Sequence, residues 1–438
     1  MNELFLKQMK ELLGDEYEAY LALLERDEIR GFRINTLKCT PEVFFEHTSW
    51  KKQATPFAYN GYYYLEDNAP GRTPAWHAGL AYMQEPSASA AVTVLQPGPG
   101  MNILDLCAAP GSKTTQIAEY MQSQGFLVAN EINAQRASVL KENVERHGIT
   151  NCMVISAKPE DVADAFEGFF DQVLCDAPCS GEGMMRKEEA ASAQWTPELV
   201  AHCAAVQKTV LAAAYRCLRP GGTLVYSTCT LNTQENEENI AWFLTEYPDM
   251  HTESCGVDFG RAAFEYGSGT SLARRIYPMD GGEGHFICRM RKDGDVPAVY
   301  PGLLHSAAIP GEVLKAYCDI FADDYPYYYF YKNQFYGGSA PFVQAGRCRL
   351  IRHQVHLGEW NGKRFEPSYA AFAANNHPAR RQIELNDEDT MRYLHGETIS
   401  VQTDKGYVGV CWKGHVLGGG RSDGTMIKNR YPKGYRNR

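Results

Sequence analysis

The sequence predicts an α/β protein built around a doubly wound, mostly parallel sheet. Between residues 99 and 292, short runs rich in β-forming residues alternate with longer segments of helical spacing. Such alternation is typical of a sheet covered by helices on both faces. A second observation supports this class: each chemically suggestive motif of the region directly follows a predicted strand, which is where ligands of such folds bind.

Residues 1–98 precede this core, and their sequence pattern predicts a segment of mixed α+β structure. A helix is expected over residues 1–28, and the stretch 31–38 is expected to form a short strand and turn. The helix is predicted from apolar residues that recur near a period of 3.6, namely Leu4, Met9, Leu12, Leu13, Tyr17, Tyr20, Leu21 and Leu24.

The alternating region itself predicts the strands and helices of the core. Strands are expected at Met101–Leu106, Phe126–Asn130, Met153–Ser156, Gln172–Cys175 and Thr223–Ser227. Helices are expected at Thr114–Met121, Ala134–Arg146, Pro197–Leu218 and Gln234–Tyr247. A hairpin-like pair is expected to close the sheet as an antiparallel edge, at Arg275–Pro278 and His285–Met290.

Beyond residue 292 the sequence predicts a linker and two smaller domains. Residues 293–310 are rich in Gly, Pro and polar residues, which is typical of a linker. We expect an intermediate C-terminal domain over residues 311–375 and a β-rich domain over residues 376–438.

The composition is that of an ordinary globular protein, 44% hydrophobic and 22% charged. The sequence shows neither a signal peptide nor an apolar run near the ~18 residues that a membrane helix needs. We therefore expect a cytoplasmic monomer without a membrane partner.

The 13 Cys residues are scattered along the chain without a Cys-x-x-Cys pair. This pattern argues against a zinc site and against a secreted disulfide framework. The closest pair, Cys175 and Cys179, straddles the end of a predicted strand, a spacing unlike that of zinc-ligand pairs. We expect no metal site.

The formal net charge of −10 is unevenly distributed. Residues 341–438 hold 16 Lys and Arg against 9 Asp and Glu, whereas the first 340 residues hold 27 against 44. This basic part is a candidate phosphate-contacting surface, and a solvated terminus is the alternative. The cations that follow the last acid are Lys428, Arg430, Lys433, Arg436 and Arg438.

A loop of small residues follows the first core strand and opens a helix. It reads Cys107-Ala108-Ala109-Pro110-Gly111-Ser112-Lys113, directly after Asp105-Leu106. Small residues let the backbone approach a ligand, and the free N–H groups of a helix start favour a carboxylate. The loop suits the methionyl end of S-adenosylmethionine, and it contains neither of the glycine-rich nucleotide-binding motifs.

Two single side chains near this loop are further candidates. Glu131 ends the second strand, where an acid can accept the two hydroxyls of a ribose. Lys113 is expected either to contact a carboxylate or phosphate or to lie on a solvated helix face.

Two Cys motifs each follow a predicted strand. Asp176-Ala177-Pro178-Cys179-Ser180-Gly181 follows one, and Ser227-Thr228-Cys229-Thr230 follows the next strand along the chain. Both loops are expected to open on the same rim of the sheet. Carbon 5 of cytosine accepts a methyl group from S-adenosylmethionine only after a thiolate has added to carbon 6, so two thiols beside an Asp predict this covalent chemistry. The alternative for any single Cys is a small buried hydrophobe.

These motifs resemble those of the Sun-type RNA cytosine-5 methyltransferases. Nearly the whole chain, including the tail 427–434, is similar to the bacterial RsmF-like branch, which acts on 16S ribosomal RNA. The resemblance implies a Rossmann-like S-adenosylmethionine-dependent methyltransferase core over residues 99–292, an RNA-binding segment over 1–98 and a PUA-like RNA-binding domain over 376–438. The motifs that carry it are Phe32–Lys38, Asp105–Lys113, Asp176–Gly183, Ser227–Thr230 and Gly282–Phe286.

The resemblance also implies roles for single residues. Cys229 is the expected nucleophile, Asp176 holds or protonates nitrogen 3 of the ring, and Cys179 helps to remove the proton from carbon 5 and to release the RNA. The implied contacts of S-adenosylmethionine are Cys107, Ala108, Ala109, Pro110, Gly111, Ser112, Lys113, Glu131, Asp176 and Ser156.

One segment departs from the family pattern. After the third strand the family usually has an Asp or Asn near the adenine, whereas this chain reads Ser156-Ala157-Lys158-Pro159-Glu160-Asp161. Ser156, Lys158 and Asp161 are the candidates for that place.

The expected partner is 16S ribosomal RNA or the small ribosomal subunit. Arg33, Lys38, Arg186 and Lys187 flank the motifs and are predicted to contact phosphate, with solvated charges as the alternative. Two aromatic runs, Tyr62–Tyr64 and Tyr325–Tyr331, either stack on unpaired bases or pack in a core. A transfer RNA cytosine-5 methyltransferase and a non-catalytic ribosome-assembly factor are the alternative functions.

Overall fold

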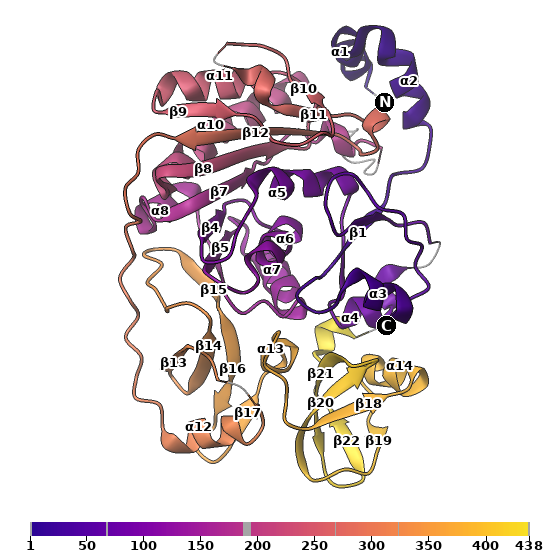
Figure 1. Ribbon diagram of the computed structural model, residues 1–438, viewed down its shortest axis with the longest axis vertical. Helices are drawn as coiled ribbons and strands as arrows, with labels where there is room; N and C mark the ends of the chain where they lie inside the picture. The colour runs from indigo at the N-terminus through magenta and orange to yellow at the C-terminus, as the bar shows by residue number, and fades with distance from the viewer. Residues whose placement is uncertain (1, 67–68, 187–193, 268, 323, 437–438) are drawn as a thin grey trace.

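The computed structural model describes residues 2–66, 69–186, 194–267, 269–322 and 324–436. Within these ranges the largest sheet has ten strands, in the order β10-β11-β12-β8-β7-β4-β5-β6-β15, with β9 also paired to β12. This sheet crosses the upper and middle part of the molecule in Figure 1. Two smaller C-terminal sheets lie below it, and the N-terminal segment lies along its side.

The five strands at the centre of this sheet run parallel. They are β4 (Asn102–Asp105), β5 (Phe126–Asn130), β6 (Cys152–Ser156), β7 (Phe170–Asp176) and β8 (Leu218–Thr228). Their side chains alternate between the two faces, and each face has its own apolar core. The structure thus confirms the predicted doubly wound arrangement.

Helices cover both faces of the sheet. Apolar residues of α8 (Pro159–Ala165), α10 (Pro197–Cys217) and α11 (Glu237–Glu246) fill the core on one face. Those of α5 (Ala90–Leu95), α6 (Ser112–Met121) and α7 (Ala134–Arg146) fill the core on the other.

One edge of the sheet is antiparallel, as the sequence predicts. The long strand β12 (His285–Lys292) pairs with β8, and Phe286 lies opposite Thr228. This pairing brings the start of β12 next to the end of β8. The other strands of this edge are β9 (Met250–Glu253), β10 (Arg261–Ala262) and β11 (Arg274–Ile276).

The other edge holds a strand that the sequence does not reveal. β15 (Arg349–His353) lies inside the predicted intermediate segment 311–375, yet it pairs antiparallel with β6. The buried guanidinium of Arg352 donates to the backbone oxygens of Cys152 and Ile149, both at 2.6 Å. This segment therefore shares the sheet of the core.

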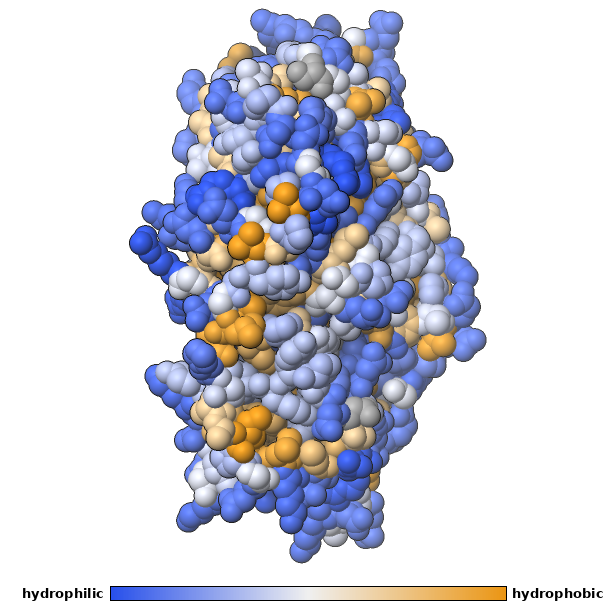
Figure 2. Space-filling view, turned by 60° about the vertical axis from the view of Figure 1, so that its left-hand side comes forward, coloured by the Kyte–Doolittle hydropathy of each residue, from blue (hydrophilic) through white to orange (hydrophobic). Residues whose placement is uncertain are grey.

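The rest of the intermediate segment forms its own four-stranded sheet, in the order β13-β14-β16-β17. Its strands and helices are α12 (Gly311–Cys318), β13 (Tyr327–Tyr331), β14 (Gln334–Gly338), β16 (Val355–Trp360), β17 (Phe365–Pro367) and α13 (Tyr369–Ala373). The preceding linker crosses the side of the molecule that Figure 2 turns forward, where scattered apolar groups lie among hydrophilic ones.

The N-terminal segment begins with two helices instead of one. The predicted helix 1–28 is broken at Gly14, whose φ of 53° suits glycine, into α1 (Glu3–Leu13) and α2 (Tyr17–Leu24). A three-stranded sheet in the order β2-β1-β3 follows. The remaining elements are β1 (Gly31–Ile34), α3 (Pro41–His47), β2 (Gly61–Tyr63), α4 (Pro74–His77) and β3 (Ala81–Met83).

The C-terminal domain contains a five-stranded sheet in the order β18-β20-β21-β22-β19, and α14 is the α-helix among its described residues. This domain shares an apolar core with the N-terminal sheet, and the hydroxyl of Tyr431 lies 2.7 Å from Nδ1 of His77. The C-terminal domain thus packs against the N-terminal sheet with helices α3 and α4, whereas the N-terminus itself lies at the top of the molecule in Figure 1. The elements of the C-terminal domain are β18 (Gln382–Leu385), α14 (Asp387–His395), β19 (Ile399–Ser400), β20 (Gly406–Trp412), β21 (His415–Ser422) and β22 (Met426–Asn429).

Two features are absent from the residues that the structure describes. None of their helices combines the length and the apolar character that crossing a membrane requires. They also contain no group of three or more His, Cys, Asp or Glu side chains placed to hold a metal ion.

The role of β15 gives a stability prediction. Arg352→Ala removes a buried cation and leaves two backbone oxygens of the β6 region without donors, so the free energy of unfolding should fall by about 3 kcal/mol. Arg349→Ala, on the exposed part of the same strand, should change it by less than about 0.5 kcal/mol. Urea unfolding of both variants measures the difference, and equal effects would contradict a structural role of the buried arginine.

Candidate functional site

The two Cys motifs meet at the carboxyl edge of the sheet. β7 and β8 are parallel neighbours in which Asp176 lies opposite Ser227, so the chain leaves both strands at the same level. Cys179 follows β7 by three residues and Cys229 follows β8 directly. Their Sγ atoms are 3.2 Å apart and both side chains are partly exposed. The structure therefore brings together the two thiols that the sequence singled out.

A hydrogen bond joins the two thiols. This bond, followed by burial, raises the pKa of Cys179 well above its ordinary value. Cys179 therefore favours the protonated thiol, and either sulfur can be the donor in the bond that joins them.

Asp176 lies beside the thiols with its charge fixed by two partners. Lys113 Nζ donates to Oδ2 at 2.7 Å, and the Ser227 hydroxyl donates to Oδ1 at 2.7 Å. Burial is the largest single influence on the pKa of Asp176 and raises it, but the nearby charges, Lys113 first among them, and the hydrogen bonds together outweigh burial, so the net pKa is lowered. The pKa of Lys113 is raised in the same way, because the charge and hydrogen bond of Asp176 and the weaker nearby charges together outweigh burial. The side chain of Asp176 is 27% exposed, so a ligand has access to this carboxylate.

The predicted cofactor loop lies next to this pair, between β4 and α6. Gly111 has a φ of 113°, and a Cβ there would lie 3.0 Å from Leu140, so glycine fits the turn best. Asp105 is fully buried at the end of β4, where Thr114 donates to Oδ2 at 2.6 Å and Oδ1 has no hydrogen-bond partner among the described residues. Burial raises the pKa of Asp105 to about 7.

Glu131 and the segment after β6 flank the same edge. The Glu131 carboxylate accepts the Asn133 N–H at 2.9 Å and lies 3.4 Å from Arg136. The Ser156 hydroxyl, at the end of β6, donates to the backbone oxygen of Ile132 at 3.3 Å. Lys158 is the exposed residue before α8 and Asp161 lies in its first turn. These positions do not select one of the three candidates for the adenine contact.

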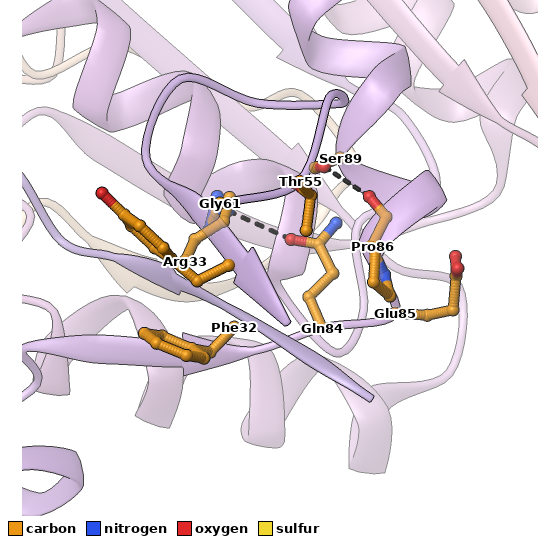
Figure 3. Close-up of a pocket in the computed structure, with 9 residues that line it drawn as sticks. Phe32, Arg33, Thr55, Gly61, Gln84, Glu85, Pro86 and Ser89 are labelled. Carbon is orange, nitrogen blue, oxygen red and sulfur yellow. Dashed lines mark hydrogen bonds between the residues drawn. The ribbon is translucent and has the colours of Figure 1, made fainter. Parts of the chain in front are cut away.

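Arg33 is part of the protein interior. Its side chain is 1% exposed, and it donates to Gln84 Oε1 at 3.1 Å and to Thr115 Oγ1 at 2.8 Å. Figure 3 shows it within a cavity of about 10 Å³, which is too small for a phosphate group. The structure does not support the predicted phosphate contact, because the guanidinium joins the N-terminal sheet to helix α6.

The other predicted RNA contacts are also engaged inside the protein. Lys38 Nζ donates to the backbone oxygens of Ala78 and Arg146 at 2.8 and 2.9 Å, and burial lowers its pKa to about 7. Arg186 forms a buried ion pair with Glu283 at 2.6 Å. Both cations serve internal contacts, which does not support phosphate binding by them. Lys187 lies outside the described residues.

The aromatic runs divide between core and surface. Tyr62 and Tyr64 are buried in the core that the N-terminal sheet shares with the C-terminal domain, which favours packing over base stacking. Tyr325 is buried and stacks on His377, with ring centroids 3.7 Å apart. Tyr327 and Tyr331 are 43% and 49% exposed.

Three buried residues of the site were not singled out from the sequence. Glu182 and Glu235 connect the two thiol loops through hydrogen bonds, and each follows a Cys by no more than six residues. His285 begins β12 beside the end of β8. Its Nδ1 lies 3.3 Å from the Ser87 hydroxyl, and its buried Nε2 has no partner among the described residues. Glu182 lies inside the motif Asp176–Gly183, whereas spacing from Cys229 was the only sequence signal for Glu235.

Family models match three parts of the chain. Residues 1–86 match the N-terminal domain of 16S rRNA methyltransferase RsmF, residues 92–291 match 16S rRNA methyltransferase RsmB/F, and residues 380–437 match the RsmF PUA domain. Ribosomal RNA small subunit methyltransferase F of Erwinia tasmaniensis is 32% identical, over 98% of this chain and 95% of that protein. The chain belongs to the RsmB/F family of 16S rRNA methyltransferases. This confirms the resemblance and the predicted fold class, including the PUA domain.

Further relatives agree with this family. The protein of the same name from Cronobacter sakazakii is 32% identical over 98% of the chain and 95% of that protein. A solved methyltransferase homologue from Pyrococcus horikoshii is 29% identical with a TM-score of 0.60, covering 67% of this chain and 95% of that one. NSun6 from Pyrococcus horikoshii, 22% identical with a TM-score of 0.59, covers 67% of this chain and 99% of that one and shows the shared fold.

The buried imidazole of His285 gives a pH prediction. Burial, and after it the charge of Lys113, lower its pKa to about 3, whereas the unfolded chain takes up the proton near pH 6.5. The folded state therefore keeps its full stability from this residue above pH 6.5 and loses it as the pH falls. Between pH 6.5 and about pH 5, the unfolding free energy of the wild type minus that of His285→Gln should fall by about 1 kcal/mol per pH unit. Urea titrations across this range measure it, and a constant difference would contradict a neutral buried imidazole.

Proposed function

We propose that this protein transfers a methyl group from S-adenosylmethionine to carbon 5 of a cytosine in 16S ribosomal RNA. The observation that carries the proposal is the pair of thiols 3.2 Å apart beside the Asp176–Lys113 ion pair. Membership of the RsmB/F family supports 16S ribosomal RNA, or the small ribosomal subunit, as the partner.

Cys229 acts first in the proposed reaction. Its thiolate forms a bond to carbon 6 of the cytosine, and the electron pair of the 5,6 double bond becomes available at carbon 5. A proton shared between nitrogen 3 and the carboxylate of Asp176 offsets the negative charge that the ring gains. S-adenosylmethionine would supply the electrophilic methyl group that carbon 5 takes up, with S-adenosylhomocysteine as the leaving group. Covalent catalysis of this kind divides one difficult step into easier ones.

Cys179 ends the reaction. The largest cause of its raised pKa is the hydrogen bond to the sulfur of Cys229. Once that sulfur carries the cytosine it is a thioether and a poor acceptor, so Cys179 loses its proton to water more easily. Its thiolate then takes the proton from carbon 5, and the electron pair of that C–H bond re-forms the 5,6 double bond. The bond between carbon 6 and Cys229 breaks, and its electron pair returns to the Cys229 sulfur. The thiol pair thus changes roles when the adduct forms.

The residues around β4 and β5 fit S-adenosylmethionine. Asp105 Oδ1 is buried and has no hydrogen-bond partner among the residues that the structure describes, and a cationic amino group beside it would favour the ionised carboxylate despite burial. The loop 107–113 offers the backbone N–H groups that open helix α6 to a carboxylate. Glu131 would hold the ribose, and Ser156 is kept as a proposed neighbour of the adenine.

Two cysteine variants test the mechanism. Cys229→Ala should lose methyl transfer by at least about 1,000-fold, because no thiolate adds to carbon 6. Cys179→Ala should form a protein–RNA adduct that persists on a denaturing gel, because addition proceeds and elimination fails. Methyl transfer by Cys229→Ala at the wild-type rate would overturn the assignment of the nucleophile. Cys203→Ala, a buried thiol outside the two motifs, is the matched control and should turn over normally.

The RNA substrate is tested separately. Bisulfite sequencing of RNA from a deletion strain should show the loss of methylation at a cytosine of 16S ribosomal RNA. A lost site in a transfer RNA would instead identify the alternative substrate class. Normal methylation everywhere, together with no binding of S-adenosylmethionine, would favour a non-catalytic assembly factor.

The cofactor assignment gives a binding prediction. Glu131→Gln should weaken binding of S-adenosylhomocysteine about tenfold or more, because it replaces the charged acceptor proposed for the ribose hydroxyls. Isothermal titration calorimetry measures this affinity. Glu142→Gln, an exposed acid on helix α7, is the control and should leave it unchanged. If the wild type, Glu131→Gln and Glu142→Gln bind S-adenosylhomocysteine with equal affinity, Glu131 does not hold the ribose.

A further inference from the structure

Two buried carboxylates join the loop that carries Cys179 to the loop that carries Cys229. Each carboxylate belongs to one loop and accepts hydrogen bonds from the other. Glu182, on the Cys179 loop, accepts the backbone N–H groups of Leu231 and Asn232, both at 2.8 Å. These residues follow Cys229. Glu235, on the Cys229 loop, accepts the backbone N–H of Ser180 at 3.0 Å, and Ser180 directly follows Cys179. Each loop therefore supplies the acid that holds the backbone of the other.

Hydrogen bonds with Glu235 and its partner Gln207 hold both sequence neighbours of Cys179. On one side, the Ser180 hydroxyl donates to Glu235 Oε1 at 2.5 Å and lies 2.8 Å from the hydroxyl of Thr230. On the other side, the side-chain amide of Gln207 donates to the carbonyl of Pro178 at 2.9 Å and to Glu235 Oε2 at 2.7 Å. The backbone at position 179 is thus fixed before and after the thiol.

The Glu182 side holds Cys229 in the same way. The N–H of Gly183 donates to the carbonyl of Cys229 at 2.9 Å. A Cβ at Gly183 would lie 2.7 Å from the Gly284 oxygen and 3.1 Å from the Cys229 oxygen, so only glycine allows this close approach. The other oxygen of Glu182 accepts from Gln8 at 2.8 Å and from the Trp195 indole at 3.0 Å. These bonds fix Glu182 itself against helix α1.

Burying each of these two carboxylates is unfavourable in free energy. Glu182 is 2% exposed and Glu235 is fully buried, and the hydrogen bonds above come from backbone amides, side-chain amides, hydroxyls and an indole rather than from cations. A buried carboxylate without a cation is less favourable than an apolar side chain of its size. Burial accordingly raises the pKa of Glu235. Stability alone therefore does not account for placing two such groups between the thiols.

We propose that Glu182 and Glu235 are positioning residues that serve different steps of the reaction. Glu182 holds the loop of Cys229 for addition to carbon 6. Glu235 holds the loop of Cys179 for removal of the carbon 5 proton and release. The inference rests on the proposed function. A displacement of about 1 Å at a reacting group is enough to cost about 100-fold in rate, so loss of either carboxylate should slow its own step.

Glu182→Gln and Glu235→Gln separate the two steps. Each change keeps the size of the side chain but removes the charge and replaces one acceptor oxygen by a donor. Glu235→Gln should behave like Cys179→Ala, with addition in a single turnover near the wild-type rate and a persistent protein–RNA adduct. Glu182→Gln should slow addition about 10- to 100-fold and accumulate no adduct. Glu235→Asp, which restores the charge, should recover part of the release.

The controls distinguish positioning from general damage. Glu238→Gln, an exposed acid on the helix that follows Glu235, should have no effect on either step. All variants should bind S-adenosylhomocysteine like the wild type, because neither acid touches the loop 107–113. A second readout is independent of catalysis: phenylarsine oxide bridges two close thiols, and both Gln variants should release it faster than the wild type, with Cys179→Ala as the blank.

The outcomes have distinct meanings. If Cys179→Ala accumulates the adduct while Glu235→Gln does not, the positioning role of Glu235 is wrong. If both Gln variants slow addition and release equally, or if a variant fails to fold while its Asp counterpart folds and turns over normally, the carboxylates are only structural. If Cys179→Ala itself gives no adduct, the proposed function fails instead.

Discussion

The parallel pairing of β7 with β8 is the constraint on which the site depends. Because Asp176 lies opposite Ser227, the two strands end at the same level and release their loops side by side. Two thiols 50 residues apart in sequence thereby come within 3.2 Å, and the Ser227 hydroxyl reaches the carboxylate of Asp176. A shift of one residue in this register would turn the paired side chains to opposite faces of the sheet.

The accessory segments are built into the core through buried polar contacts. Arg33 and Lys38 join the N-terminal sheet to helices α6 and α7, and Arg352 joins β15 to the region of β6. Cations that flank the catalytic motifs in sequence are thus occupied inside the protein. Exposed cations remain in the C-terminal domain, at Lys428 and Lys433 among others, where the sequence also shows its positive charge.

Local patterns predicted the core closely. The expected bounds of Phe126–Asn130 and Ala134–Arg146 agree with β5 and α7, because each segment carries its own periodicity and its own end signals. The predicted helix over residues 1–28 is interrupted, since the positive φ of Gly14 depends on packing as well as on residue type. β15 was not predicted, because pairing with β6 is a contact across nearly 200 residues.

The sequence by itself determined the α/β class, the family and the two Cys motifs at strand ends, because strand periodicity and short motifs are local properties of the chain. Only the tertiary structure decided that the thiols touch, that Arg33 and Arg186 are buried, and that Glu182 and Glu235 hold each other's loops. Whether a charged side chain faces solvent or a buried partner is set by elements distant in sequence, and no local pattern records them.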